Sequence, residues 1–244
     1  MHYNRRELFK QDRNSIYGIN LKKIKSKRII LILISWFLIP VVLAILLLYK
    51  PTGSQPAEMV ENQEEVSSYL THILLPEFYN GAQRQEPFEL VIRQEGINEA
   101  ITQGKWPKKA ENITFLTPRV FFEPEQIRLI GTVVMKSVEF VLTIAGKFVI
   151  DEEGLLNLNV DTIKVGAINV TPVARMVAEK MYAEKLEESG VNANDLGTKV
   201  AGSLFSNIGF EPVFKVGEAK IRAEKITVSN KKLVINFIPA DRND

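Results

Sequence analysis

A long run of apolar residues is the first feature of the chain. Residues 29–49 read IILILISWFLIPVVLAILLLY and contain no charged side chain, while Lys27, Arg28 and Lys50 flank the run. A helix needs about 20 such residues to cross the hydrocarbon core of a bilayer. The run therefore predicts an N-terminal transmembrane helix over 29–49. We interpret it as an uncleaved anchor because a cleavable signal has a shorter apolar core and a small-residue cleavage site.

Beyond residue 57 the hydrophobic pattern alternates between helical and strand spacing. Apolar residues at helical spacing predict an amphipathic helix over 58–75, closed by Pro76. A strand over 87–94 and a short helix over 95–104 follow. Segments rich in β-branched and aromatic residues then predict an antiparallel meander over 113–122, 126–136, 138–150 and 155–170.

Two more helices and two strands complete the pattern. A stripe formed by Val173, Met176, Val177 and Met181 predicts a helix that begins at Thr171-Pro172 and ends near Ser189. A second stripe, ending at Gly209, is formed by Leu196, Val200, Leu204 and Ile208. Both stripes are expected to face the core. Strands over 212–228 and 232–238 close an α+β domain in which a curved antiparallel sheet packs on amphipathic helices.

The two central strands are apolar on both faces. Apolar residues occupy odd positions in 126–136 and even positions in 138–150, so a tight turn or bulge is predicted at Lys136-Ser137. A sheet that is apolar on both faces needs cover on both, from helices, a partner or lipid. The second face is therefore our candidate for binding an apolar ligand or a partner, and it consists of Ile130, Val134, Val141, Ala145 and Val149.

The charge distribution sets the expected topology. Residues 1–28 hold nine Lys or Arg and two acidic residues, a net charge of +7, whereas the whole chain carries +2. Positive residues near a span stay in the cytoplasm. We expect a cytoplasmic tail (1–28), a span in the inner (plasma) membrane, a linker (50–57) and an extracytoplasmic domain (58–244). The candidates for contact with anionic lipid are Lys22, Lys23, Lys25, Lys27 and Arg28.

Few residues in the chain could support catalysis. It has no cysteine and two histidines, and it has no Gly-rich phosphate loop. Glu95 and Glu99, four residues apart on one short helix, are the candidate carboxylates of a hydrolase, although solvated helix charges explain them better. We therefore expect no catalytic residue, no metal, no cofactor and no nucleic-acid partner.

Three segments carry a family resemblance. FELVIRQEGINEAI at 88–101, GLLNL at 154–158 and VTP at 170–172 resemble small membrane-anchored bacterial proteins of the YpmS-like type. The similarity extends more distantly to LmeA-type and tubular lipid-binding proteins. It implies a curved antiparallel sheet wrapped around helices, with an apolar groove for acyl chains, and it supplies no catalytic residue.

Two functions fit these features. The first is a membrane-anchored extracytoplasmic module, not an enzyme, that binds a lipid or another apolar ligand near the bilayer. The alternative is a non-catalytic scaffold or accessory subunit that presents its apolar faces to another envelope protein. The expected partners are accordingly the membrane, a lipid and another envelope protein.

Overall fold

The computed structural model describes residues 34–36, 38–55, 66–110, 112–189 and 195–240, with the backbone alone at 185–189. The chain divides into two compact units, residues 1–46 and 47–244, which are described separately. In the first unit, residues 34–36 and 38–46 are helical with exposed apolar side chains. Within the described ranges, no helix is long and apolar enough to cross a membrane. Residues 29–33 and 37 of the predicted span and the basic tail lie outside those ranges.

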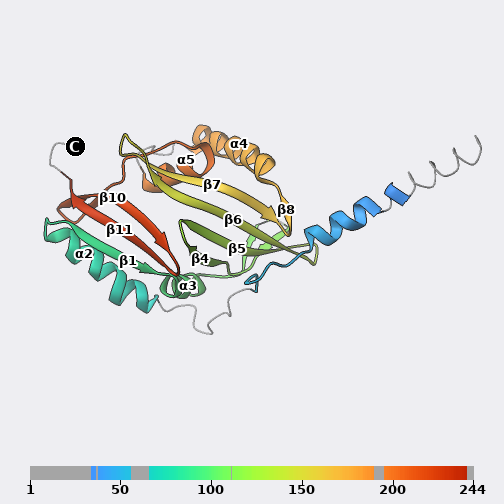
Figure 1. The fold of residues 1–244 in the computed structure, drawn as a ribbon, viewed down its shortest axis with the longest axis horizontal. Coiled ribbons are helices and arrows are strands. Elements are labelled where there is room, and N and C mark those ends of the chain that lie inside the picture. The colour runs from blue at the N-terminus through green and yellow to red at the C-terminus, as the bar shows by residue number, and fades with distance from the viewer. Residues whose placement is uncertain (1–33, 37, 56–65, 111, 190–194, 241–244) are drawn as a thin grey trace, which may run out of the picture. The chain divides into compact units, whose positions relative to one another are not determined.

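Residues 47–244 form an α+β unit with two antiparallel sheets (Figure 1). The first sheet has the order β1-β11-β10-β9. Its strands are β1 (Phe88–Arg93), β9 (Val213–Val216), β10 (Ala219–Ser229) and β11 (Lys232–Pro239). The expected single strand over 212–228 is wrong, since the chain turns back at Gly217, whose φ of 62° favours glycine.

The second sheet has the order β2-β3-β5-β6-β7-β8, and β4 also pairs with β5. Its strands are β2 (Lys108–Ala110), β3 (Ile113–Phe115), β4 (Arg119–Glu123), β5 (Gln126–Met135), β6 (Val138–Ile150), β7 (Leu156–Val165) and β8 (Ile168–Asn169). The turn predicted from the change of parity is confirmed, because β5 and β6 are joined by Lys136 and Ser137 alone, with φ of 48° and 65°. Two such residues form the turn that suits a right-twisted hairpin.

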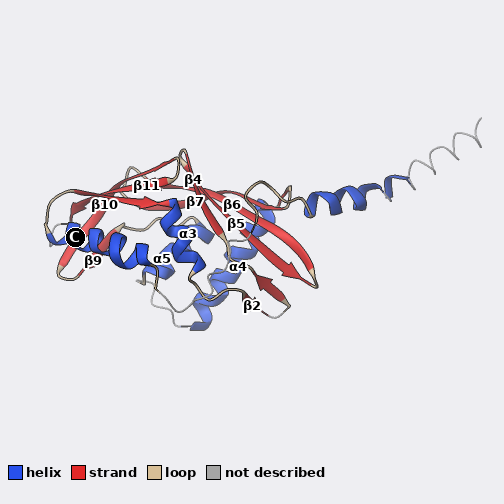
Figure 2. Cartoon of the chain, turned by 90° about the horizontal axis from the view of Figure 1, so that it is seen from below, coloured by secondary structure: helices blue, strands red, loops and turns tan. Residues whose placement is uncertain are grey.

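Helices lie on one side of these strands. They are the π-helix η1 (Leu70–Leu74) and the α-helices α2 (Leu75–Gln83), α3 (Gln94–Thr102), α4 (Thr171–Ser189) and α5 (Leu196–Ser206). Figure 2 shows α3, α4 and α5 below β6, β7, β10 and β11. The helices predicted near 95 and 171 are confirmed within about two residues, as expected for helix ends.

The helix around Pro76 differs from its prediction. Pro76 does not end it, because helical structure continues to Gln83, and residues 58–65 lie outside the described part of the chain. Pro76 sits in the first turn of α2, directly after η1, where Leu75 N–H donates to the Leu70 carbonyl. A proline lacks an N–H and crowds the carbonyl four residues earlier, and a wider π turn relieves both problems.

The first sheet and α2 enclose the main core. Leu90, Ile221, Ala223 and Phe237 are buried there, and Phe78 of α2 packs against them. A second cluster of Phe122, Val228 and Leu233 joins the ends of the two sheets. Main-chain hydrogen bonds reinforce this junction, with Lys231 N–H donating to the Phe122 carbonyl at 2.9 Å. The second cluster and this hydrogen bond therefore attach the β4–β5 end of the second sheet to the first sheet.

Candidate functional site

An apolar cavity of about 630 Å³ lies between the second sheet and helices α4 and α5. Its sheet side includes Ile127, Leu129, Ile144, Phe148, Leu156, Leu158 and Ile163, and its helix side includes Ala178, Leu196, Val200, Leu204 and Phe205. Lys147, Asn159 and Arg175 are its polar members among the described residues. Ligand pockets typically measure about 300–1,000 Å³ and are lined mainly by apolar side chains. The cavity is thus suited to an apolar ligand.

Strand alternation and a bulge create the sheet side of the cavity. Leu129 pairs with Ile144 across β5 and β6, which places both side chains on the same face. The β6–β7 register shifts between Ala145 and Gly146. A Cβ atom at position 146 would lie 2.5 Å from the carbonyl oxygen of Asn159, so glycine lets the two backbones approach closely.

The five residues predicted to bind a ligand or partner lie on the opposite face of these strands. Ile130, Val141 and Ala145 are buried there, at 3%, 2% and 6% exposure, and Val134 and Val149 are half-buried. The cavity uses the other face, where Leu129 and Ile144 lie. Alternation showed that both faces are apolar, but it carries no information on which face the helices cover.

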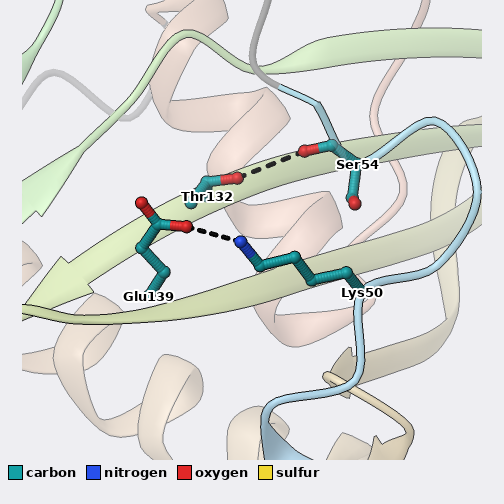
Figure 3. A network of polar contacts seen from close by, with 4 residues as sticks. All are labelled: Lys50, Ser54, Thr132 and Glu139. Carbon is teal, nitrogen blue, oxygen red and sulfur yellow. Dashed lines mark hydrogen bonds and ion pairs between the residues drawn. The ribbon is translucent and has the colours of Figure 1, made fainter.

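The segment predicted as a linker contacts the second face. Thr132 Oγ donates to the carbonyl of Ser54 at 3.4 Å, and Lys50 Nζ lies 2.6 Å from a carboxylate oxygen of Glu139 (Figure 3). A Cβ atom on Gly53 would lie 3.1 Å from the Phe121 ring. Residues 50–54 therefore lie along β5 and β6 and supply part of the cover that this face requires.

Polar contacts fix the two helices on β7. At the start of α4, Thr171 Oγ accepts a hydrogen bond from Ile163 N–H at 2.7 Å and lies 2.6 Å from Asn169 Oδ1. In α5, the fully buried Ser203 Oγ accepts from Leu158 N–H at 2.7 Å. Asp195 is the N-cap of α5, and its carboxylate accepts from the Gly197 and Thr198 N–H groups. These contacts hold the helix side of the cavity against its sheet side.

We expect Ser203→Ala to loosen α5 from β7. The substitution leaves the buried Leu158 N–H without its acceptor, which costs about 1–3 kcal/mol. Hydrogen exchange of the Leu158 amide should accelerate, and the thermal midpoint should fall. Ser206→Ala, on the same helix but partly exposed, is the matched control. Equal effects of the two substitutions would contradict a specific role for Ser203.

The apolar stripes predicted on α4 and α5 differ in whether they line the cavity. In α5, Leu196, Val200 and Leu204 line the cavity, but the stripe is not buried, because Leu196 (48%), Leu204 (38%) and Ile208 (56%) are exposed. The prediction that the stripes face the core is wrong for α4 as well, where the four stripe residues are exposed: Val173 (61%), Met176 (64%), Val177 (47%) and Met181 (63%). The cavity is instead contacted by Arg175 and Ala178 of α4. The less exposed side of α4 consists of Ala174, Ala178 and Tyr182, a row that the stripe of larger apolar residues does not indicate.

Both candidate carboxylates have partners within the domain. Glu99 Oε1 accepts hydrogen bonds from Ser67 Oγ at 3.1 Å and from Tyr69 N–H at 3.2 Å, next to the start of the helix at residue 68. Glu95 is exposed and lies 3.7 Å from Lys231 Nζ. Among the described residues there is no group of three His, Asp or Glu that could hold a metal ion.

Comparison with known proteins gives no match, either to a family model or to a curated protein sequence. The cavity and its surroundings are therefore the basis for a functional proposal. The cationic candidates in the tail (Lys22, Lys23, Lys25, Lys27 and Arg28) lie outside the described residues.

Proposed function

We propose that residues 47–244 bind the acyl chain of a lipid, or a similarly apolar ligand, in the cavity between β5–β7 and α4–α5. The observation that carries this proposal is the cavity itself, whose volume and lining match an apolar ligand site. An apolar occupant makes dispersion contacts with the lining, so its binding stabilises the surrounding fold. No covalent chemistry is required of the lining residues.

The proposal places this unit at a membrane. Residues 29–49 form the anchor, with the basic tail in the cytoplasm and the domain outside the inner membrane. The described part of this segment supports the idea because Trp36, Leu38, Ile39 and Ile45 are all more than half exposed on the helix. A helix that is apolar on all sides needs an apolar environment around it. A bilayer supplies both that environment and the lipid.

The first test labels the cavity. The full chain is reconstituted in vesicles that contain a lipid with a photoactivatable acyl chain, and crosslinked peptides are identified by mass spectrometry. We expect crosslinks within β7 and α5, including Leu158 and Leu204. Crosslinks confined to residues 29–49 would contradict an acyl-binding cavity.

A pair of matched variants sharpens this test. Ala178 lines the cavity, whereas Ala183 is an exposed residue of the same helix. Ala178→Phe fills part of the cavity and should lower the crosslinking yield in β7 and α5 roughly tenfold, a loss of about 1.4 kcal/mol of binding, because the ring occupies space that the acyl chain needs. Ala183→Phe should leave the yield unchanged. Equal yields in the two variants would contradict the site.

One observation favours the alternative function, a non-catalytic scaffold for an envelope protein. The exposed α4 row is contiguous along one side of the helix, and exposed apolar patches often mark protein–protein contacts. In that case, Met176→Glu with Met181→Glu should abolish a stoichiometric protein crosslink through α4 in native membranes. Acyl labelling of the cavity would be absent from the parent chain. A cavity that labels, with no protein crosslink at α4, would favour the lipid-binding module.

A further inference from the structure

One end of the second sheet combines exposed apolar side chains with lysines. Backbone pairing aligns Ile113 with Met135 and Met135 with Val138, so the ends of β3, β5 and β6 lie side by side. Lys108 pairs with Phe115 in the adjoining β2–β3 hairpin. We call this end the basic tip and define it as Lys108, Lys109, Phe115, Met135, Lys136 and Val138, all of which are exposed.

The charge of the basic tip is strongly biased. Three of its six members are lysines, and none is acidic. Glu139 is the one carboxylate among the described residues of 105–116 and 132–140, and it is paired with Lys50 (Figure 3). Glu111 lies outside the described residues. The tip lysines therefore present positive charge beside Phe115, Met135 and Val138, which are each about two-fifths exposed.

The chain enters the domain at this same end. Helical structure ends at residue 47, and Lys50, three residues later, already pairs with Glu139 at the start of β6. The carbonyl of Ser54, four residues further on, accepts a hydrogen bond from Thr132 of β5. Three residues of chain reach no more than about 11 Å, so the pairing of Lys50 keeps residue 47, the start of this unit, near the β5–β6 end of the sheet.

We infer that the basic tip is a docking surface for an anionic bilayer. Its lysines contact the head groups, while Phe115, Met135 and Val138 enter the interfacial layer. Basic residues close to an anionic surface each strengthen binding roughly fivefold, and this attraction is screened by salt. The inference rests on the proposed membrane anchor but is independent of the acyl-binding cavity.

The absence of cysteine allows a direct test. Ser137→Cys places a fluorophore in the turn of the basic tip of the full chain, which is reconstituted in vesicles that carry head-group quenchers. Asn230→Cys, in the β10–β11 turn, is the matched control. That turn bonds to the end of β4, with Lys231 N–H donating to the Phe122 carbonyl. The ten residues of β5 separate the two ends by about 30 Å.

We expect quenching at position 137 in vesicles rich in anionic lipid and little at position 230. Substituting Lys108, Lys109 and Lys136 with Gln, or raising the salt to about 1 M, should lower the quenching at position 137 at least threefold. Acyl crosslinking in the cavity should not change in the substituted chain. Equal quenching at both positions, or quenching at 137 that ignores lipid charge, would overturn the inference.

Flotation of the same vesicles separates the two proposals. A chain that floats with the vesicles but shows no quenching at position 137 retains its anchor and contradicts the docking surface alone. A chain that does not float contradicts the anchor and the docking surface together.

Discussion

Phe237→Ala is expected to lower the free energy of unfolding of residues 47–244 by about 3–5 kcal/mol, the usual cost of truncating a fully packed aromatic residue. Phe237 is 3% exposed, and its ring centroid lies 5.2 Å from that of Phe88, 5.4 Å from Phe78 and 6.0 Å from Phe214. It thereby joins α2 to three strands of the first sheet. Removing the ring leaves a cavity that several elements must collapse to fill.

Phe115→Ala is the matched control for this measurement. The chemical change is the same, but Phe115 is 37% exposed at the end of β3. We expect a loss of no more than about 1 kcal/mol, as for most surface substitutions. Denaturant unfolding of the full chain in mild detergent, followed by circular dichroism, would measure both variants. Similar losses would show that the Phe237 cluster does not carry the stability of the first sheet.

Gly96→Ala is expected to destabilise the same unit by about 1–3 kcal/mol, the cost of overpacking a tight site. A Cβ atom at position 96 would lie 2.3 Å from the ring of Tyr69. That ring is buried, and its hydroxyl accepts a hydrogen bond from Arg93 N–H at 2.8 Å. Since alanine is favoured over glycine in a helix by roughly 1 kcal/mol, a net loss here would isolate the contact between α3 and Tyr69.

Gly131→Ala is the matched control for Gly96→Ala, because it makes the same chemical change at a glycine with more space around it. A Cβ atom at position 131 would meet Pro118 at 3.8 Å, an ordinary contact, so the change in unfolding free energy should be close to zero. The same unfolding measurement applies to both glycines. If Gly96→Ala were as stable as the parent chain, the close packing of α3 on Tyr69 would be contradicted.

Several features of this protein were determined locally by its sequence. The turn at Lys136-Ser137 followed from a change of parity, because strand side chains alternate and the alternation can shift only through a turn or bulge. The α4 helix and the strands β5 and β6 followed from their apolar periodicity and turn residues. These signals come from residues that are close together in the sequence. A single sequence is therefore enough to show them.

Other features depended on contacts between distant residues. Alternation marked both faces of β5 and β6 as apolar, yet only the docking of α4 and α5 through Thr171 and Ser203 decided that Leu129 lines the cavity and Ile130 does not. Likewise, the side of α4 that carries Met176 stayed exposed because Ala178 faces the cavity instead. Periodicity fixes which side chains share a face, whereas the choice of the buried face depends on which distant elements pack against it.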